Sequence, residues 1–325
     1  MHGLVLGKFL PPHRGHLHLI EFASRFASKV TVVVGSLSAE SIPGELRYRW
    51  IKELFPHLNV IHLSDENPQY PHEHPNFWDI WKRSLERVVV DPVDLVFCSE
   101  PYGEPLAGIL GATFIPTNQF RSSIDLSASE IRQDMVGHWD SIPLIVKRHF
   151  QRRVLIFGPE SSGKTTLALG LAARYPGLIV GEYARTWLQG SEENFTLEDM
   201  EIIARGQWAS ERALASQATP FLFCDTDPLT TMLWCEELFG EVPDSVRQLA
   251  LDNPYHLTLL LKPDLPWCRG PLRFTPETRG KFFERCREVL EEHQRPFVVV
   301  EGTGTSRFEA ACREIDRLQS DLNSL

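Results

Sequence analysis

One segment of the sequence fits a complete phosphate-binding pattern. Residues 158–165 read G-P-E-S-S-G-K-T, which matches G-x-x-x-x-G-K-[ST] between the apolar run 154–157 and the helical run 167–174. Glycine-rich turns of this kind hold phosphates with backbone N–H groups at a helix N-terminus. We predict that Lys164 reaches the β- and γ-phosphates and that the Thr165 hydroxyl binds Mg²⁺. The predicted nucleotide-binding residues of this loop are Gly158, Glu160, Ser161, Ser162, Gly163, Thr165 and Thr166.

Acidic and basic segments in the same half of the chain are candidates for the remaining chemistry. Asp225-Thr226-Asp227 follows the predicted strand 221–224, and Glu182 follows the predicted strand 178–180, where open parallel sheets bind ligands. Either Glu182 or Asp225 is predicted to take up a hydroxyl proton or to order a metal ion; helix caps and solvated loop acids are the alternatives. A basic segment interrupted by Pro and Gly contains Trp267, Arg269, Arg273 and Arg279. Such a segment is typical of a lid that closes over phosphates, and a solvated loop is the alternative.

Two histidines lie at the start of the first predicted helix. Residues 7–16 read G-K-F-L-P-P-H-R-G-H directly after the apolar run 4–6. Gly15 separates His13 from His16 and allows a ligand to approach the backbone. Imidazole donors beside a helix N-terminus suit a polyphosphate that gains charge in a transition state. Metal binding is the alternative, but no cysteine or acidic residue at suitable spacing supports it.

A second polar segment, residues 125–132, reads D-L-S-A-S-E-I-R. Ser127 or Ser129 with Glu130 is by itself typical of a helix N-cap. Beside His13 and His16, the two hydroxyls and Arg132 are predicted to form a second phosphate-binding wall of one site.

Apolar runs alternate with helical-period segments along the whole chain of 325 residues. Short strands rich in β-branched and other apolar residues between helices predict parallel sheets covered on both faces. The pattern restarts near residue 150. We therefore predict an α/β protein with two doubly wound domains, residues 1–149 and 150–325.

Composition limits the function classes. The formal net charge is −10, which argues against a general nucleic-acid binder because phosphate neutralisation needs clustered Lys and Arg. No apolar stretch reaches the ~18 residues of a membrane span, and the N-terminus lacks the basic lead of a signal peptide. The six cysteines show no metal-type pairing and are predicted to be reduced. A cytoplasmic protein without membrane insertion is expected.

Taken together, the motifs resemble a known enzyme family. G-x-F-x-P-x-H-x-G-H with a later S-x-S-x-I-R is similar to the nucleotidylyltransferase superfamily, in particular the nicotinamide mononucleotide (NMN) adenylyltransferases. Followed by a phosphate loop, it resembles the bifunctional NadR family, in which an adenylyltransferase with a Rossmann-like fold precedes a P-loop ribosylnicotinamide kinase. Further similar segments are Arg47-x-Arg49-Trp50, Tyr70-Pro71, Trp78-Asp79-x-Trp81, Ser99-Glu100, Glu182-Tyr183-x-Arg185, Asp225-x-Asp227, Pro266-Trp267 and Ser306-Arg307-Phe308.

The resemblance implies two ATP-dependent reactions with Mg²⁺ and the small-molecule substrates ribosylnicotinamide and NMN, giving NAD. Lys8, His13, His16, Arg132, Lys164, Glu182 and Asp225 would be catalytic. Gly7, Phe9, Leu10, Arg47, Ser99, Glu100, Ser127, Ala128 and Ser129 would bind ATP or NAD in the first domain. Trp78, Trp81, Tyr183, Arg185, Asp227, Trp267, Arg273 and Arg279 would contact substrate, with plain core packing as the alternative for the two tryptophans.

Some family members carry an N-terminal DNA-binding helix-turn-helix domain. This sequence begins at the first predicted strand, so DNA binding is not expected. The lid departs from the family pattern, with Arg269-Gly270-Pro271-Leu272-Arg273 where an acidic-Gly step would precede the arginine. Three other interpretations remain: a P-loop ATPase or GTPase switch with a nucleotide-sensing first domain, a regulator that has lost catalysis in one half, and another nucleotidylyltransferase fused to a kinase.

Overall fold

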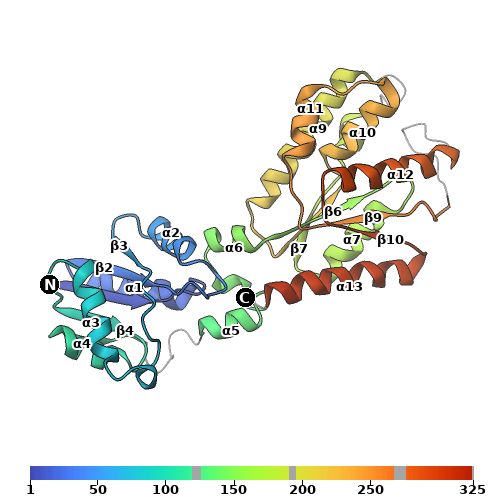
Figure 1. Cartoon of the computed structure of the whole chain (residues 1–325). Helices are drawn as coiled ribbons and strands as arrows, with labels where there is room; N and C mark the ends of the chain where they lie inside the picture. The colour runs from blue at the N-terminus through green and yellow to red at the C-terminus, as the bar shows by residue number, and fades with distance from the viewer. Residues whose placement is uncertain (119–125, 190–194, 267–275, 324–325) are drawn as a thin grey trace. The chain divides into compact units, whose positions relative to one another are not determined.

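The computed structural model describes residues 1–118, 126–189, 195–266 and 276–323 (Figure 1). The chain divides into two compact units: unit 1 is Met1–Val146 with the last residues from Asp321, and unit 2 is Lys147–Ser320. Each unit contains one five-stranded sheet whose neighbouring strands all pair in parallel. The predicted α/β class with two parallel sheets is confirmed.

Unit 1 has the strand order β3-β2-β1-β4-β5. Its strands are β1 (His2–Gly7), β2 (Lys29–Gly35), β3 (Asn59–Leu63), β4 (Leu95–Cys98) and β5 (Thr113–Pro116). Its helices are α1 (Arg14–Phe26), α2 (Gly44–Leu54), α3 (Phe77–Val88), α4 (Gly103–Leu110) and α5 (Ala128–Gln133), with short 3₁₀ turns at Pro71–Glu73 and Trp139–Ser141. Helix α6 (Leu144–Phe150) follows.

Both faces of this sheet are apolar, because alternate residues of each strand point to opposite sides. Val5 and Val32 pack with α1 and α2 on one face, while Leu4 and Val33 pack with α3 and α4 on the other. All four valine and leucine side chains are fully buried. Continuous apolar strands therefore predict a sheet covered on both sides, as observed.

Unit 2 has the strand order β10-β9-β6-β8-β7. Its strands are β6 (Arg152–Phe157), β7 (Gly177–Val180), β8 (Phe221–Asp225), β9 (Leu257–Leu261) and β10 (Phe297–Val300). Its helices are α7 (Lys164–Arg174), α8 (Tyr183–Trp187), α9 (Leu197–Ala215), α10 (Pro228–Phe239), α11 (Asp244–Leu251), α12 (Pro276–Glu292) and α13 (Gly304–Leu322). Helices α7 and α13 contribute to the core on one face, and α9 to α12 to the core on the other.

In each unit the first strand lies at the centre of the sheet, and the chain leaves neighbouring strands toward opposite faces. Helix α1 follows β1 on one face and α4 follows β4 on the other. In unit 2, α7 follows β6 and α10 follows β8 in the same manner. Open α/β sheets bind ligands in the crevice at such a switch point. The fold therefore points to one candidate site at the carboxyl edge of each sheet.

Among the described residues, no helix combines the length and the apolar content that crossing a membrane requires.

Candidate functional site

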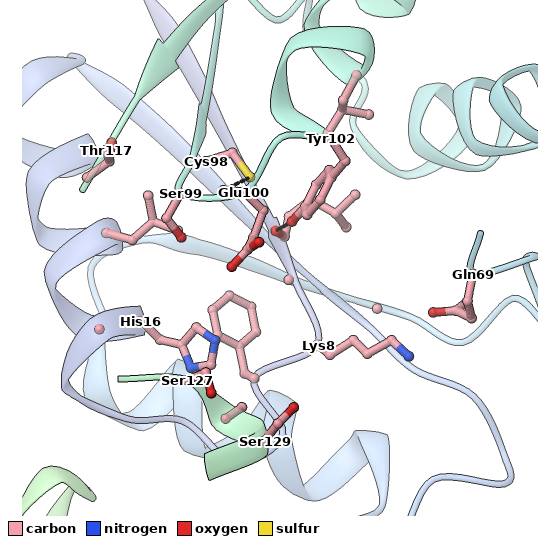
Figure 2. A pocket seen from close by; sticks show the side chains of 18 of the residues that line it. Lys8, His16, Gln69, Cys98, Ser99, Glu100, Tyr102, Thr117, Ser127 and Ser129 are labelled. Atoms are coloured by element: carbon pink, nitrogen blue, oxygen red, sulfur yellow. Dashed lines mark hydrogen bonds between the residues drawn. The ribbon is translucent and has the colours of Figure 1, made fainter. Parts of the chain in front are cut away.

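A cavity of about 680 Å³ lies at the carboxyl edge of the unit 1 sheet (Figure 2). Its walls come from segments that follow β1, β4 and β5 and from the starts of α1 and α5. This is the switch point between β1 and β4, and the volume is within the range of small-molecule sites. Predicted site residues that line it are Gly7, Lys8, Phe9, His13, His16, Trp78, Trp81, Ser99, Glu100, Ser127, Ala128 and Ser129.

The rings of His13 and His16 contact each other at the start of α1, with centroids 3.8 Å apart and planes tilted by 38°. The Nδ1 of His13 accepts a hydrogen bond of 3.1 Å from the N–H of Gly15 and so caps the helix. A Cβ on Gly15 would lie 2.9 Å from the His13 ring, which explains the glycine between them. The two rings are held together by this turn.

The surroundings of His16 favour its neutral form. Burial, and then the neighbouring His13, hold the pKa of His16 well below its ordinary value. Its Nδ1 is buried and has no hydrogen-bond partner among the described residues. A neutral ring with a free buried nitrogen at the cavity wall is available to an incoming phosphate ligand. Among the described residues, no group of three or more His, Cys, Asp or Glu side chains is arranged to hold a metal.

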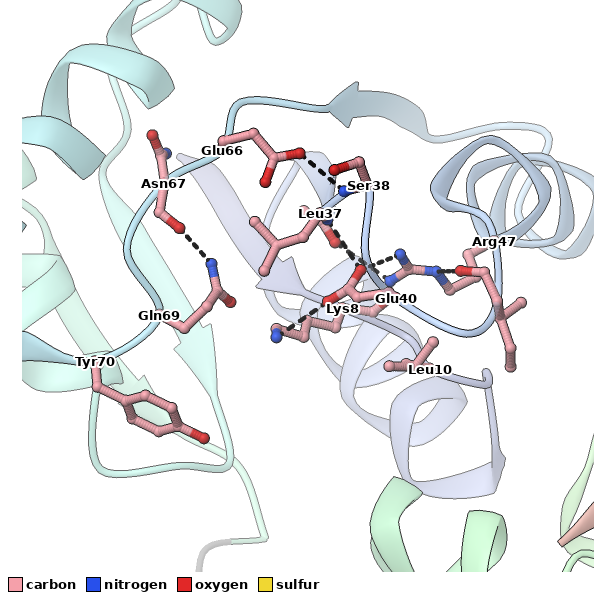
Figure 3. Close-up of polar contacts among 12 residues, drawn as sticks. Lys8, Leu10, Leu37, Ser38, Glu40, Arg47, Glu66, Asn67, Gln69 and Tyr70 are labelled. Atoms are coloured by element: carbon pink, nitrogen blue, oxygen red, sulfur yellow. Dashed lines mark hydrogen bonds and ion pairs between the residues drawn. The ribbon is translucent and has the colours of Figure 1, made fainter. Parts of the chain in front are cut away.

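Lys8 and Arg47 share the carboxylate of Glu40 (Figure 3). The Nζ of Lys8 lies 3.0 Å from Glu40 Oε1, and the Arg47 guanidinium contacts Oε2. Burial acts to raise the pKa of Glu40, but hydrogen bonds from Leu37 and Lys8 and the charge of Arg47 hold it below its ordinary value. The half-exposed Lys8 is thus tethered at the cavity edge by a carboxylate that Arg47 keeps ionised.

The phosphate loop of unit 2 adopts the conformation that its motif predicts. Gly163 has φ +85° and Gly158 has φ +134°, both in the region that favours glycine. A Cβ on Gly158 would lie 2.8 Å from the carbonyl oxygen of Leu261. The Nζ of Lys164 donates to the carbonyl oxygens of Gly158 (3.0 Å) and Pro159 (2.9 Å), so it folds over the loop. Ser161 and Ser162 lie within the loop, and Thr166 is exposed on α7.

Two of the predicted acidic residues, Asp225 and Glu182, lie beside this loop. The Thr165 hydroxyl donates to Asp225 Oδ2 at 2.5 Å, and Asp225 Oδ1 is buried with no hydrogen-bond partner among the described residues. Burial raises the pKa of Asp225, and the charge of Glu182 raises it further. Glu182 itself pairs with Arg185 at 2.5 Å. The structure thus brings Thr165, Asp225, Glu182 and Arg185 to one side of the phosphate loop.

Comparisons with known proteins agree with this geometry. A family model described as "AAA domain" matches residues 153–307. The trifunctional NAD biosynthesis/regulator protein NadR of Escherichia coli K12 is 29% identical over 337 residues, covering 97% of this chain and 82% of that protein. The chain is similar to NadR over nearly its whole length. The crystal structure of a NadR protein in complex with NAD and AMP-PNP shares its fold, with a TM-score of 0.67, 22% identity, and coverage of 98% and 96%.

A third match is short and local. The nicotinamide-nucleotide adenylyltransferase of Aeropyrum pernix is 61% identical over 33 residues, which is 10% of this chain and 19% of that protein. The similarity to NadR therefore covers nearly the whole chain, whereas this match covers 33 residues.

Three residues that the NadR resemblance placed against nucleotide do not line the cavity. Arg47 is fully buried, and its described bonds go to the carbonyl oxygens of Ile42, Lys8 and Gly35 and to Glu40. Neither Leu10 nor Arg132 lines the cavity; the Leu10 carbonyl oxygen accepts from the Arg132 guanidinium at 2.5 Å. The prediction that Arg47 contacts nucleotide directly is therefore corrected. The N–H donors of Arg47 bond to groups inside the protein, and Arg47 supports the loop that carries Lys8.

Ser127 is both the cap of α5 and a residue of the cavity wall. Its hydroxyl accepts from the Glu130 N–H at 3.2 Å, and its N–H donates to the Glu130 carboxylate at 2.6 Å, which makes a capping box at α5. Ser127 and Ser129 also line the cavity, and Arg132 donates to the Ser129 hydroxyl at 3.3 Å. The second wall is therefore a helix N-terminus fixed by its own cap.

In unit 2, the prediction for Asp227 is also corrected, and Arg279 is placed beside the phosphate loop. Asp227 is buried as the N-cap of α10, where its carboxylate accepts from the Thr230 N–H at 3.1 Å. Burial raises its pKa to about 6, although Arg295 lies 3.6 Å away. Arg279 is 5% exposed and donates to the carbonyl oxygens of Ser161 (3.2 Å) and Leu265 (3.3 Å). Arg279 therefore lies against the phosphate loop, and its contact with phosphate or substrate stays a prediction.

The lid residues Trp267 and Arg273 lie outside the described residues. Several cavity residues were not predicted from the sequence, among them Tyr102, whose hydroxyl donates to the Leu6 carbonyl oxygen at 2.8 Å, and Asp65. Tyr102 follows the Ser99-Glu100 step after β4, so its place one turn beyond a strand end is a signal that could have found it. Glu40 offers no comparable signal.

Arg47→Met should destabilise the protein, because it leaves the buried Glu40 with one cation fewer. Removing one partner of a buried ion pair costs about 3–5 kcal/mol of unfolding free energy. Arg49→Met is the matched control on the same helix, because its pair with Glu45 is exposed and such pairs contribute about 0–1 kcal/mol. Equilibrium urea unfolding at neutral pH measures both. Equal losses in the two variants would contradict the structural role of Arg47.

Glu160 should make stability depend on pH. Burial raises its pKa to about 7, against the attraction of Lys164. Since the folded-state pKa is raised, its ionisation weakens the folded state progressively as the pH rises from about 4.5 to about 7. Glu160→Gln should therefore be more stable than the parent at pH 8, and this gain should vanish near pH 4. A gain that is the same at pH 4 and pH 8 in urea unfolding would refute this.

Proposed function

We propose that this chain makes NAD in two ATP-dependent steps, one in each unit. In unit 2, the γ-phosphoryl group of ATP passes to the 5′-hydroxyl of ribosylnicotinamide and gives NMN and ADP. In unit 1, an oxygen of the NMN phosphate attacks the α-phosphorus of a second ATP, and pyrophosphate leaves as NAD forms. The proposal is supported by a cavity at the sheet edge of unit 1 and a separate phosphate-loop motif in unit 2, in a chain similar to NadR.

Unit 1 fits adenylyl transfer because the NMN phosphate is already ionised near neutral pH and needs no general base. Catalysis then consists of alignment and of stabilising charge at the five-coordinate phosphorus. His16 presents a buried unpartnered nitrogen, and Lys8 offers an ammonium at the cavity edge. Trp78 and Trp81 lie on the cavity wall, where an aromatic face attracts the positively charged nicotinamide ring.

Unit 2 fits phosphoryl transfer to a hydroxyl. Lys164 at the phosphate loop neutralises the β- and γ-phosphates once it releases the loop carbonyls. Glu182 and Asp225 lie on the same side of the loop, and one of them receives the hydroxyl proton. Arg185, paired with Glu182, holds that carboxylate in place.

Mg²⁺ is part of the proposal. The Thr165 hydroxyl beside the unpartnered Asp225 Oδ1 is a pair of oxygen donors of the kind that Mg²⁺ prefers, and the residues fit the ion. When bound, the ion would neutralise charge on the ATP phosphates. We also propose a cytoplasmic location, which the five described cysteines support because all are unpaired thiols.

One assay tests the proposal. ATP and Mg²⁺ are supplied with either ribosylnicotinamide or NMN, and NMN, NAD, ADP and pyrophosphate are resolved. We expect ADP and NMN in the first mixture, followed by NAD, and NAD with pyrophosphate in the second. ATP hydrolysis that does not depend on ribosylnicotinamide would instead favour a P-loop switch.

A further inference from the structure

Gln207 is a buried amide that joins two loops of the unit 2 site. It lies on α9 and is 2% exposed, so both ends of its side chain need partners. Its Oε1 accepts from the N–H of Tyr183 at 2.8 Å, and its Nε2 donates to the carbonyl oxygen of Thr226 at 3.3 Å. One side chain thus bridges the segment after β7 and the segment after β8.

The first bond anchors the residue that follows Glu182. Helix α8 begins at Tyr183 with Glu182 as its N-cap, and the Glu182 side chain makes no capping hydrogen bond to the helix. Gln207 accepts from the N–H of Tyr183, the first helical residue, and so fixes the start of α8 from outside. The Glu182 carboxylate pairs with Arg185 and lies close enough to Asp225 to raise the pKa of that residue, after burial has raised it.

The second bond fixes the Asp225 segment. Thr226 has φ +70°, a left-handed conformation that is strained for a β-branched residue. Its N–H donates to the Ile156 carbonyl oxygen at 3.2 Å, and its own carbonyl oxygen accepts from Gln207. The backbone of Thr226, which follows Asp225, is therefore held by β6 through its N–H and by α9 through its carbonyl oxygen.

Gly206, the residue before Gln207, also contacts the Tyr183 segment. A Cβ on Gly206 would lie 2.1 Å from a ring atom of Tyr183, so the ring rests against the bare backbone of α9. Gly206 and Gln207 together dock the Tyr183 segment by one ring contact and one hydrogen bond.

We propose that Gln207 is a positioning residue for phosphoryl transfer, which sets the spacing of the Glu182 and Asp225 segments against the phosphate loop. It acts through the hydrogen bonds to these two segments. The inference rests on the proposed kinase function of unit 2.

The test compares Gln207→Met, which keeps the length and loses both bonds, with Gln207→Glu, which keeps an acceptor for Tyr183. Gln207→Met should lower kcat for ribosylnicotinamide phosphorylation about 10- to 100-fold, in line with misplacement of catalytic groups. The KM for ATP and adenylyl transfer in unit 1 should stay unchanged. Gln207→Glu should recover part of kcat. Arg205→Gln, an exposed position on the same helix, is the control and should match the parent.

Hydrogen exchange supplies a second readout. The Tyr183 amide should lose protection in Gln207→Met and keep it in Gln207→Glu. A parent-like kcat in Gln207→Met overturns the inference, and so does unchanged protection of the Tyr183 amide in that variant. An equal fall of kcat and of melting temperature in both variants also overturns it, because that result marks a merely structural residue. A parent that does not phosphorylate ribosylnicotinamide instead defeats the proposed function itself, and that outcome is separate from any effect of the variants.

Discussion

His16→Ala is expected to lower adenylyl transfer from ATP to NMN by about 10²–10³-fold, the cost of losing one preorganised donor to transition-state charge. Phosphorylation of ribosylnicotinamide should continue at the parent rate, because the phosphate loop lies in the other unit. Initial rates of NAD and ADP formation measure the two reactions in one preparation. His57→Ala is the matched control, since His57 is exposed and does not line the cavity.

Lys164→Ala should give the reciprocal result, with phosphorylation lost and adenylyl transfer retained. Loss of both activities in either variant, in protein whose unfolding curve matches the parent, would show one shared site. The assignment of separate sites to the two units would then be wrong.

Glu182→Gln and Asp225→Asn are expected to lower kinase kcat by about 10²-fold or more, as for a positioned base or a metal-ordering acid. Adenylyl transfer should hardly change, because the NMN phosphate has no proton to lose. Partial rescue at high Mg²⁺ would mark the metal-ordering acid, and absence of rescue would mark the base. Glu237→Gln, an exposed acid on α10, is the control.

Stability separates a catalytic from a structural role for Asp225. Burial raises the pKa of this carboxyl, so its ionised form weakens the folded state at neutral pH. Asp225→Asn should therefore unfold at an equal or higher urea concentration than the parent while it loses activity. Parent-rate phosphorylation by both acid variants would show that Glu182 and Asp225 are structural and that the kinase site lies elsewhere.

The fold was largely predictable because most strands are continuous apolar runs. The predicted runs 154–157, 178–180 and 221–224 lie within β6, β7 and β8. Strand β5 was missed since it is short and lies at the sheet edge, and its four residues are only partly buried. Neither its length nor its polarity distinguishes it from a loop.

The phosphate loop could be predicted because its chemistry is local in sequence. Asp227 also carried a readable signal: an Asp directly before Pro228 is typical of an N-cap followed by proline at the first helical position. The burial of Arg47 could not be predicted, because it depends on Glu40 and on carbonyl groups brought together by folding. Gln207 is similar, since its partners lie 24 and 19 residues away in opposite directions along the chain.

The central place of the first strand in each sheet has a consequence during synthesis. Gly3 of β1 pairs with Leu95 of β4, and Val154 of β6 pairs with Leu257 of β9. At about 5–20 residues per second, a ribosome needs several seconds to deliver each late partner. During that interval one edge of an apolar strand has no neighbour, which is the condition under which nascent chains associate. Fragments that end before β4 or before β9 are therefore expected to be recovered as aggregates or chaperone complexes.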